Sequence, residues 1–240
     1  MLTTTSELRG KTVLALDAPL GRVEDFLFDD QNWVVRYLVT RTGTWLSNQL
    51  ILLSPHFIGK LDAEADVIRV RLLKFQIEAS PPLAVGLPVS RSYEEEYYRY
   101  FGLPAYWEGS ALWGRSYSPL DSPGKRDEQD FKLHYHRDTK HLQSSNALCG
   151  FQLQTAGASV GRVKGFAISD SAWEVKDLVV RAGYWFASRE VLIAPAKIDY
   201  IAYEEATVYT SLSKQDIERT AEHGRGEVQG RTSAPEWTQQ

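Results

Sequence analysis

The chain has 240 residues, and its 43% hydrophobic and 24% charged content is ordinary for a globular protein. Its net charge of -4 argues against a general nucleic-acid binder, which needs clustered Lys and Arg to contact phosphates. The single cysteine, Cys149, excludes an internal disulfide. No run of eighteen apolar residues is present, and residues 1–6 lack the pattern of a signal peptide, so we expect no integral membrane segment and a cytoplasmic location.

Residues 8–80 have the pattern of short strands separated by turns. Runs rich in β-branched and aromatic residues lie at 12–16, 23–28, 34–39, 49–53 and 67–72. Each run ends in residues that favour turns, such as Asp29-Asp30-Gln31-Asn32 after the second. Regularly spaced short strands predict a mainly β fold, a sandwich or a barrel. We expect residues 74–78 to form one helical turn, which ends before Pro81.

The segment from Leu8 to Glu78 recurs 140 positions later, from Leu148 to Glu218, with about 23 identities over 71 paired positions. Internal repetition of this kind indicates one small domain present twice. The identical positions include residues typical of a core: Val23, Phe26, Val35, Leu38, Val39, Leu52 and Ile58. Two glycine pairs, Gly21/Gly161 and Gly43/Gly183, are expected in turns with positive φ.

Two tryptophan pairs also recur, Trp33/Trp173 and Trp45/Trp185. They would form either a platform on which a ligand stacks or large plugs at the ends of a small barrel. The second interpretation is favoured, because large aromatic residues contribute much of the burial in a small core. Replacing Trp45 or Trp185 with alanine is then expected to destabilise the protein by roughly 3–5 kcal/mol.

A connector without a counterpart in the repeat follows, at residues 83–145. The pattern Ser92-x-x-Glu95 predicts a capping box and a helix beginning near Tyr93, which Gly102 and Pro104 end. Nine of the 25 residues from Tyr93 to Tyr117 are aromatic. We therefore predict a packed clasp at residues 90–117 that joins two barrels of one chain or joins two chains. The alternative is a satellite core within one chain. The candidate interaction residues are Tyr93, Tyr97, Tyr100, Tyr106, Trp107 and Trp113.

Three histidines end the connector, His134, His136 and His141. Imidazoles can hold zinc, but no carboxylate or cysteine stands at a convincing spacing, so no metal site and no cofactor are expected. Residues 221–240 are poor in apolar residues and are expected to form a flexible tail. The predicted organisation is repeat one at 1–82, the connector at 83–145, repeat two at 146–220 and the tail at 221–240.

A family resemblance rests on a series of motifs in the first repeat. These are Gly21-Arg22-Val23, the pair Asp29-Asp30, Trp33, Arg36-Tyr37-Leu38-Val39, Gly43-x-Trp45-Leu46 and Leu52-Leu53-Ser54-Pro55. The series resembles the PRC-barrel domain, which the cytoplasmic domain of the purple-bacterial reaction-centre H subunit shares with the C-terminal domain of a ribosome small-subunit maturation factor. The resemblance implies two small six-stranded PRC-type β-barrels, as in bacterial tandem-barrel proteins. The second copy departs from it at Ser169 and Asp177.

The resemblance implies a non-catalytic interaction or assembly module, because PRC barrels dock onto protein or ribonucleoprotein assemblies. An enzyme is not expected: the sequence has no nucleophile elbow, phosphate loop, zinc motif or dinucleotide fingerprint, and Asp29-Asp30 is better explained as a hairpin turn than as an acid-base pair. Two alternatives stay open. One is a ribosome- or RNA-associated factor using Arg22, Arg36 and Arg41; the other is a peripheral component of photosynthetic electron-transfer complexes.

Overall fold

A computed structural model describes residues 2–43, 46, 48–58, 61, 65–82, 88–116, 118–120, 142–183, 189–217 and 219. Trp45, Trp185, the three connector histidines and residues 221–240 lie outside the described residues. The chain divides into two compact units. The first comprises Met1–Ala147 with Phe166–Lys176, and the second comprises Leu148–Gly165 with Asp177–Gln240.

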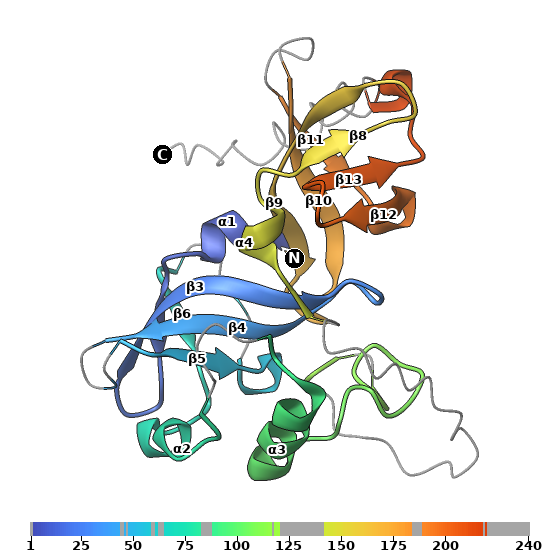
Figure 1. The fold of residues 1–240 in the computed structure, drawn as a ribbon. Helices are drawn as coiled ribbons and strands as arrows, with labels where there is room; N and C mark the ends of the chain where they lie inside the picture. Colours follow the sequence, from blue (N-terminus) through green and yellow to red (C-terminus); the bar gives the residue numbers. More distant parts are fainter. Residues whose placement is uncertain are drawn as a thin grey trace, which may run out of the picture. The chain divides into compact units, whose positions relative to one another are not determined.

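The repeat is visible in the order of the elements (Figure 1). The first copy consists of β1 (Leu2–Thr4), α1 (Thr5–Leu8), β2 (Thr12–Leu14), β3 (Pro19–Asp29), β4 (Val34–Thr42), β5 (Leu50–Leu53), the 3-10 turn η2 (Pro55–Phe57), β6 (Val67–Arg69) and α2 (Lys74–Glu78). The second copy consists of β7 (Leu142–Ser144), α4 (Ser145–Leu148), β8 (Gln152–Gln154), β9 (Ser159–Ser169), β10 (Val175–Ala182), β11 (Glu190–Ile193), η4 (Pro195–Lys197), β12 (Ile198–Ala202) and β13 (Thr207–Thr210). Between them lies α3 (Arg91–Phe101).

The predicted mainly β fold is confirmed, and every predicted strand of the first copy is present. Residues 74–78 form the expected helical turn, α2. The repetition begins earlier than sequence identity suggested, because β1–α1 at 2–8 and β7–α4 at 142–148 keep the same offset. Hereafter the first repeat is residues 2–78 and the second repeat is residues 142–218.

Two sheets hold these strands. One has the order β5-β4-β3-β2-β6, with β7 added to β3, and the other has the order β11-β10-β9-β8-β13-β12, with β1 added to β9. Most pairs are antiparallel, whereas β2 pairs in parallel with β6 and β8 pairs in parallel with β13. The corresponding strands of the two copies thus pair in the same order.

The repeated apolar residues form the core, as predicted. All seven predicted core residues of the first copy are buried, with Phe26 and Leu38 at 0% exposure. Five of their counterparts are also buried: Val163, Phe166, Val175, Leu178 and Val179. The exceptions are Ile198, which is half-buried, and Leu192, which is 48% exposed where Leu52 is 4% exposed.

Among the recurring glycines, Gly21 has the expected positive φ, 155°, but it lies inside a strand and not in a turn. Gly161 and Gly183 do not have positive φ, so the expected left-handed turns are wrong at these positions. Gly21 and Gly161 lie inside the long strands β3 and β9. A Cβ at Gly21 would lie 1.9 Å from the Arg41 carbonyl oxygen, and one at Gly161 would lie 2.4 Å from that of Arg181. Glycine is therefore required because the neighbouring strand passes too close for any side chain.

The tryptophans of the two hairpin turns adopt left-handed backbone conformations that sequence reasoning missed. Trp33 has φ 54° and Trp173 has φ 57°. This region is uncommon for a bulky residue, and its recurrence in both copies indicates a constraint that the surrounding structure imposes. Trp173 is fully buried, and half-buried Trp33 stacks on Phe28 with ring centroids 5.7 Å apart. Both rings therefore pack, as the core interpretation expected.

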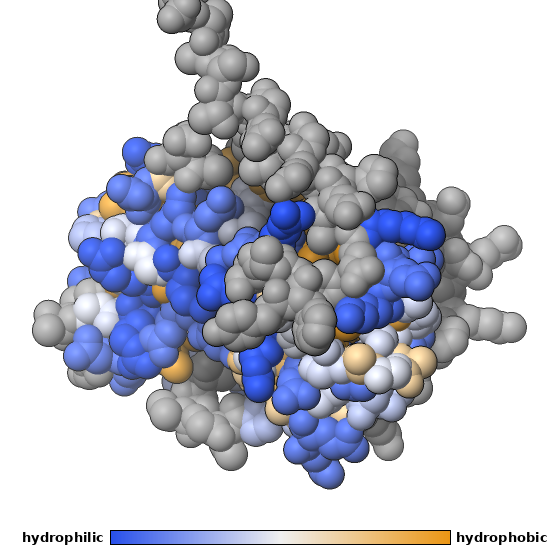
Figure 2. Space-filling view, turned by 90° about the horizontal axis from the view of Figure 1, so that it is seen from above, coloured by the Kyte–Doolittle hydropathy of each residue, from blue (hydrophilic) through white to orange (hydrophobic). Residues whose placement is uncertain are grey.

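The coloured residues on the face shown in Figure 2 are mainly hydrophilic, and the hydrophobic ones appear as small separate spots. Exposed large apolar side chains lie on several elements, among them Phe75 on α2, Tyr100 on α3 and Tyr200 on β12. Among the helices of the described residues, none has the length and apolar character needed to cross a bilayer.

Candidate interaction site

The connector helix α3 begins two residues earlier than the predicted capping box. The N-cap is Ser90, whose Oγ accepts a hydrogen bond from the Tyr93 amide at 3.2 Å. The proposed Ser92–Glu95 box is therefore wrong, because Ser92 already lies within the helix. The predicted end is confirmed: Gly102 adopts the left-handed conformation, with φ 65°, that commonly closes a helix.

One face of α3 is buried within the first unit. Glu94 is 0% exposed, Tyr97 1% and Tyr98 2%. The Tyr97 hydroxyl donates to the Leu52 carbonyl at 3.2 Å and accepts from the Ser54 amide at 3.1 Å. These backbone groups lie on and directly after β5, the last strand of its sheet. A side chain of the connector thus satisfies backbone groups that a further strand would otherwise pair.

Glu94 collects polar groups from three segments. Its Oε1 accepts from the Tyr37 hydroxyl of β4 at 3.0 Å and from the Tyr106 hydroxyl at 2.8 Å, and its Oε2 lies 2.9 Å from Arg91 Nη1. A buried carboxylate is tolerated only when it is paired in this way. Burial raises the pKa of Tyr37 and Tyr106 well above the ordinary value, and the charge of Glu94 adds to this shift. Both phenols therefore remain hydrogen-bond donors to Glu94.

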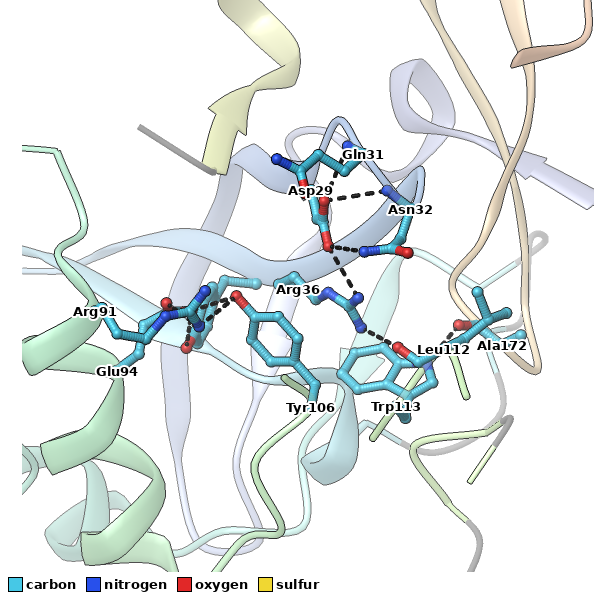
Figure 3. A network of polar contacts seen from close by, with 11 residues as sticks. Asp29, Gln31, Asn32, Arg36, Arg91, Glu94, Tyr106, Leu112, Trp113 and Ala172 are labelled. Carbon is cyan, nitrogen blue, oxygen red and sulfur yellow. Dashed lines mark hydrogen bonds and ion pairs between the residues drawn. The ribbon is translucent and has the colours of Figure 1, made fainter. Parts of the chain in front are cut away.

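Arg36 is the second centre of the network (Figure 3). Its side chain is 1% exposed and lies 3.1 Å from Asp29 Oδ2, and its Nη1 donates to the Leu112 carbonyl. The guanidinium carbon lies 3.9 Å from the centre of the Tyr106 ring and 4.9 Å from that of the Trp113 ring. Arginine suits this position because its planar group can stack on rings while it donates in its own plane.

Asp29 is held in the ionised form by its partners. Burial favours the neutral carboxyl, but the Arg36 charge and the hydrogen bonds from Asn32 outweigh it, so the pKa of Asp29 lies below its ordinary value. Its Oδ1 also accepts from the Gln31 and Asn32 amides at 2.9 and 3.1 Å, which closes the turn before β4. The acidic turn therefore has two roles, in the hairpin and in positioning Arg36.

His56 borders the same network. Its ring lies at right angles to Trp113 with centroids 5.0 Å apart, and its Nδ1 lies 2.9 Å from Ser54 Oγ. Burial, and then the positive charge of Arg36, lowers the pKa of His56 to about 4. The imidazole is therefore neutral at physiological pH, and protonation would bring a second positive charge beside the buried guanidinium.

Trp113 connects the network to the second repeat inside the first unit. Its Nε1 donates to the Ala172 carbonyl at 2.7 Å, and Ser118 Oγ donates to the Ser171 carbonyl at 2.9 Å. Both acceptors lie in the turn between β9 and β10. The connector thus contacts β4 of the first repeat and a hairpin turn of the second.

The structure brings most of the six predicted interaction residues together, but it exposes them unequally. Tyr97, Tyr106 and Trp113 are buried, Tyr93 and Trp107 are half-buried, and Tyr100 is 43% exposed. Tyr93 packs near Tyr97, Tyr106 packs on Trp107, and Tyr100 packs on Phe101. Whether the segment also joins chains stays a prediction.

Sequence reasoning missed the partners of these rings: Asp29, Arg36, Tyr37, His56, Glu94 and Tyr98. A signal for them existed. Arg36, Tyr37 and His56 stand where the second copy has Lys176, Asp177 and Ala196, within stretches that otherwise repeat closely. Such differences mark the places where the connector contacts the first copy.

Both buried carboxylates of this site, Asp29 and Glu94, are engaged by an arginine and by hydroxyl or amide donors. In the part of the chain that the structure describes, no three His, Cys, Asp or Glu side chains gather as metal ligands would. His134, His136 and His141, which were not expected to form a metal site, lie outside the described residues.

Residues 4–77 match the family model of the PRC-barrel domain. The match runs from the N-cap of α1 into α2, and so covers the first repeat. It supports membership of the PRC-barrel family for this part of the chain. A search of curated proteins found no match to the chain.

Proposed function

We propose that this protein is a non-catalytic interaction module built from two PRC-type barrels and that it binds a partner protein on the surface formed by α2 and α3. The match of residues 4–77 to the PRC-barrel domain supports an interaction role. The repeated element order supports a second barrel at residues 142–218. The buried network supports a structural use of the titratable side chains in the connector. We place the protein in the cytoplasm.

The observation that carries the choice of surface is the exposure of two rings, Phe75 on α2 and Tyr100 on α3, whose hydroxyl donates a hydrogen bond to α2. Phe75 is 60% exposed, and Tyr100 is 43% exposed with its hydroxyl donating to the Gln76 carbonyl at 2.9 Å. That hydrogen bond fixes the Tyr100 ring, so little side-chain entropy would be lost when a partner covers it. Tyrosine, phenylalanine and arginine are enriched at protein interfaces.

A depression of about 340 Å³ adjoins Tyr100 and is open to solvent. It is lined by Ala79, Ser80, Pro81, Pro82, Glu96, Arg99 and Tyr100. Its wall combines an aromatic ring and two prolines with one acidic and one basic side chain. Such a lining suits a protruding apolar side chain flanked by polar groups of a partner, in keeping with an apolar centre and a polar rim.

The RNA-associated alternative gains no support from its three arginines. Arg36 is buried against Asp29, Arg41 pairs with Glu24, and Arg22 donates to the Gly10 carbonyl at 2.8 Å. Phosphate binding would need these groups to be available together. A peripheral role beside photosynthetic complexes is likewise not favoured by a specific observation. A second copy of this chain remains a partner to be tested on the α2–α3 surface.

The test compares a double variant, Phe75→Ser with Tyr100→Ser, with Tyr200→Ser as a matched control. Tyr200 is 57% exposed on β12, so all three changes remove an exposed ring and should alter stability little. Each purified protein is immobilised, and bound proteins from the native host are quantified by mass spectrometry. We expect a partner that the wild type and the control retain and that the double variant recovers at least tenfold less.

Light scattering on the same proteins separates self-association from a different partner. A wild-type mass of two chains that falls to one chain in the double variant would identify a second copy as the partner. Equal recovery of every bound protein by the double variant and the wild type, with no change of mass, would contradict the proposed surface.

A further inference from the structure

The first strand of each repeat pairs with the long strand of the other repeat. In the first unit, β1 runs antiparallel to the end of β9, with Leu2 opposite Ser169 and Thr4 opposite Ala167. In the same unit, β7 runs antiparallel to the end of β3, with Leu142 opposite Asp29 and Ser144 opposite Leu27. The two pairings correspond at the repeat offset of 140: Leu2 opposite Ser169 becomes Leu142 opposite Asp29, and Thr4 opposite Ala167 becomes Ser144 opposite Leu27. The strands are thus exchanged reciprocally.

The two hairpin turns repeat this reciprocity in their backbone hydrogen bonds. The Val35 amide donates to the Trp173 carbonyl at 2.8 Å, and the Val175 amide donates to the Trp33 carbonyl at 2.7 Å. Both tryptophans that accept these bonds are the ones in the left-handed conformation. The uncommon conformation therefore occurs in both copies at the residues whose carbonyls pair with the other copy.

Side chains of the long strands β3 and β9 also contact each other. Phe28 and Phe166 are each 1% exposed, and their ring centroids lie 5.1 Å apart. Thr5 Oγ1, next to β1, accepts from the Phe166 amide at 3.0 Å. At the corresponding place beside β7, Ser145 Oγ donates to Asp25 Oδ1 at 2.8 Å. The same helix-start position, 5 and 145, fastens each exchanged strand to the opposite copy.

We infer from these contacts that the repeats carry a self-complementary binding surface, and that the partner each surface fits is the other repeat. The exchange itself, rather than the covalent connector, holds the two halves together. Each half contributes a strand and a hairpin turn, and it receives the same two from its partner. The rings of Phe28 and Phe166, which stand at different positions of the two repeats, pack on each other. Backbone pairing and apolar burial together give such a surface both register and affinity.

The test uses the full chain with a recognition site for a sequence-specific protease inserted between Leu120 and Leu142. The folded protein is purified, cleaved, and measured by size-exclusion chromatography with light scattering at micromolar concentration and after serial dilution. We expect the two fragments to elute as one particle with the mass of the uncleaved chain, and to separate in denaturant. Fragments that separate at micromolar concentration would overturn the inference.

Three variants locate the source of the binding. Two variants place a proline in the middle of an exchanged strand, Thr3→Pro in β1 and Gln143→Pro in β7. Proline interferes with strand pairing at these positions. Trp113→Phe removes the connector's hydrogen bond to the Ala172 carbonyl but keeps a ring. We expect each proline to raise the dissociation constant of the cleaved halves at least tenfold, and Trp113→Phe to raise it less.

The reverse order, with Trp113→Phe weakening the cleaved pair more than either proline, would assign the binding to the connector and contradict the inference. Circular dichroism of the uncleaved variants checks that each has folded. If a proline variant fails to fold, the dilution series of the cleaved parent still decides the question, because fragments that exchange strands must stay associated.

Discussion

The same sheet face is covered in one repeat and open in the other. In the first repeat, Tyr37 is 0% exposed, Leu52 4% and Ser54 0%, because α3 and the segment after it pack there. In the second repeat, the corresponding Leu192 is 48% exposed and Ala194 is also exposed. The strands beneath the two faces have the same order and nearly the same bounds. The fold therefore does not determine what the face binds.

A few substitutions account for the difference. The side chains of Arg36, Tyr37 and His56 contact the connector, and their counterparts are Lys176, Asp177 and Ala196. The second face thus has neither the hydroxyl for a buried carboxylate nor the guanidinium for stacking rings. Among the described residues, the first face therefore binds a segment of its own chain, whereas the second face has exposed side chains at Leu192 and Ala194.

The largest loss of stability is expected when a residue of the first face is replaced by its counterpart from the second face. Tyr37→Asp should destabilise the protein by more than about 5 kcal/mol, because it removes a fully buried ring and places a carboxylate beside Glu94. The reciprocal change, Asp177→Tyr, alters a half-buried position and should cost less than about 1 kcal/mol. Urea unfolding of both variants measures the difference. Similar midpoints for the two would show that the faces are equivalent after all.

A smaller effect is expected at the neighbouring position. Arg36→Ala leaves Asp29 buried without its cation and should cost about 3–5 kcal/mol, the usual range for breaking a buried ion pair. Lys176→Ala removes a side chain that is 45% exposed and should cost at most about 1 kcal/mol. Denaturant titrations of the matched pair test this. A loss at Lys176 as large as that at Arg36 would contradict the asymmetry.

The smallest effect concerns pH and His56, which has no titratable counterpart in the second repeat. Burial and the charge of Arg36 lower the pKa of His56 to about 4 in the folded chain, whereas its ordinary pKa is near 6.5. Between these two pH values the unfolded chain binds a proton at His56 that the folded chain does not bind. Stability should therefore fall between pH 6.5 and pH 4, by at most roughly 3 kcal/mol. His56→Ala, which installs the residue of the second repeat, should flatten this slope. An unchanged slope in unfolding experiments across this range would exclude His56 as its source.

The sequence predicted the architecture well because strands and cores leave local patterns. The runs at 34–39 and 49–53 became β4 and β5, and the seven repeated apolar residues of the first copy are all buried. Leu192 was misjudged because burial at this position depends on neighbouring segments: Leu52 is buried where Tyr97 of α3 bonds its carbonyl, whereas Leu192 is 48% exposed. An identical residue in a repeat predicts the same place in the fold, but not the same environment.

The site was predicted only in part, because its contacts join residues far apart in the chain. The aromatic excess at 93–117 identified the connector, yet no local pattern pairs Glu94 with Tyr37 across 57 positions, or Arg36 with Leu112 across 76. The predicted capping box was wrong because Ser90 and Ser92 are nearly equivalent candidates for the N-cap of the helix. Packing of the buried face at Glu94 and Tyr97 selects Ser90. The exchanged strands were missed because three-residue strands such as β1 carry too little pattern.

The hydroxyl of Tyr97 has a further consequence for the behaviour of the chain in solution. By bonding the Leu52 carbonyl and the Ser54 amide, it occupies part of the free edge of β5, where a strand from another molecule could otherwise add. Such edges are common starting points for aggregation. In the first repeat, then, the connector blocks part of a strand edge on which other chains could stack. Many sheet edges are protected by charged residues or proline, whereas here a tyrosine side chain has this role.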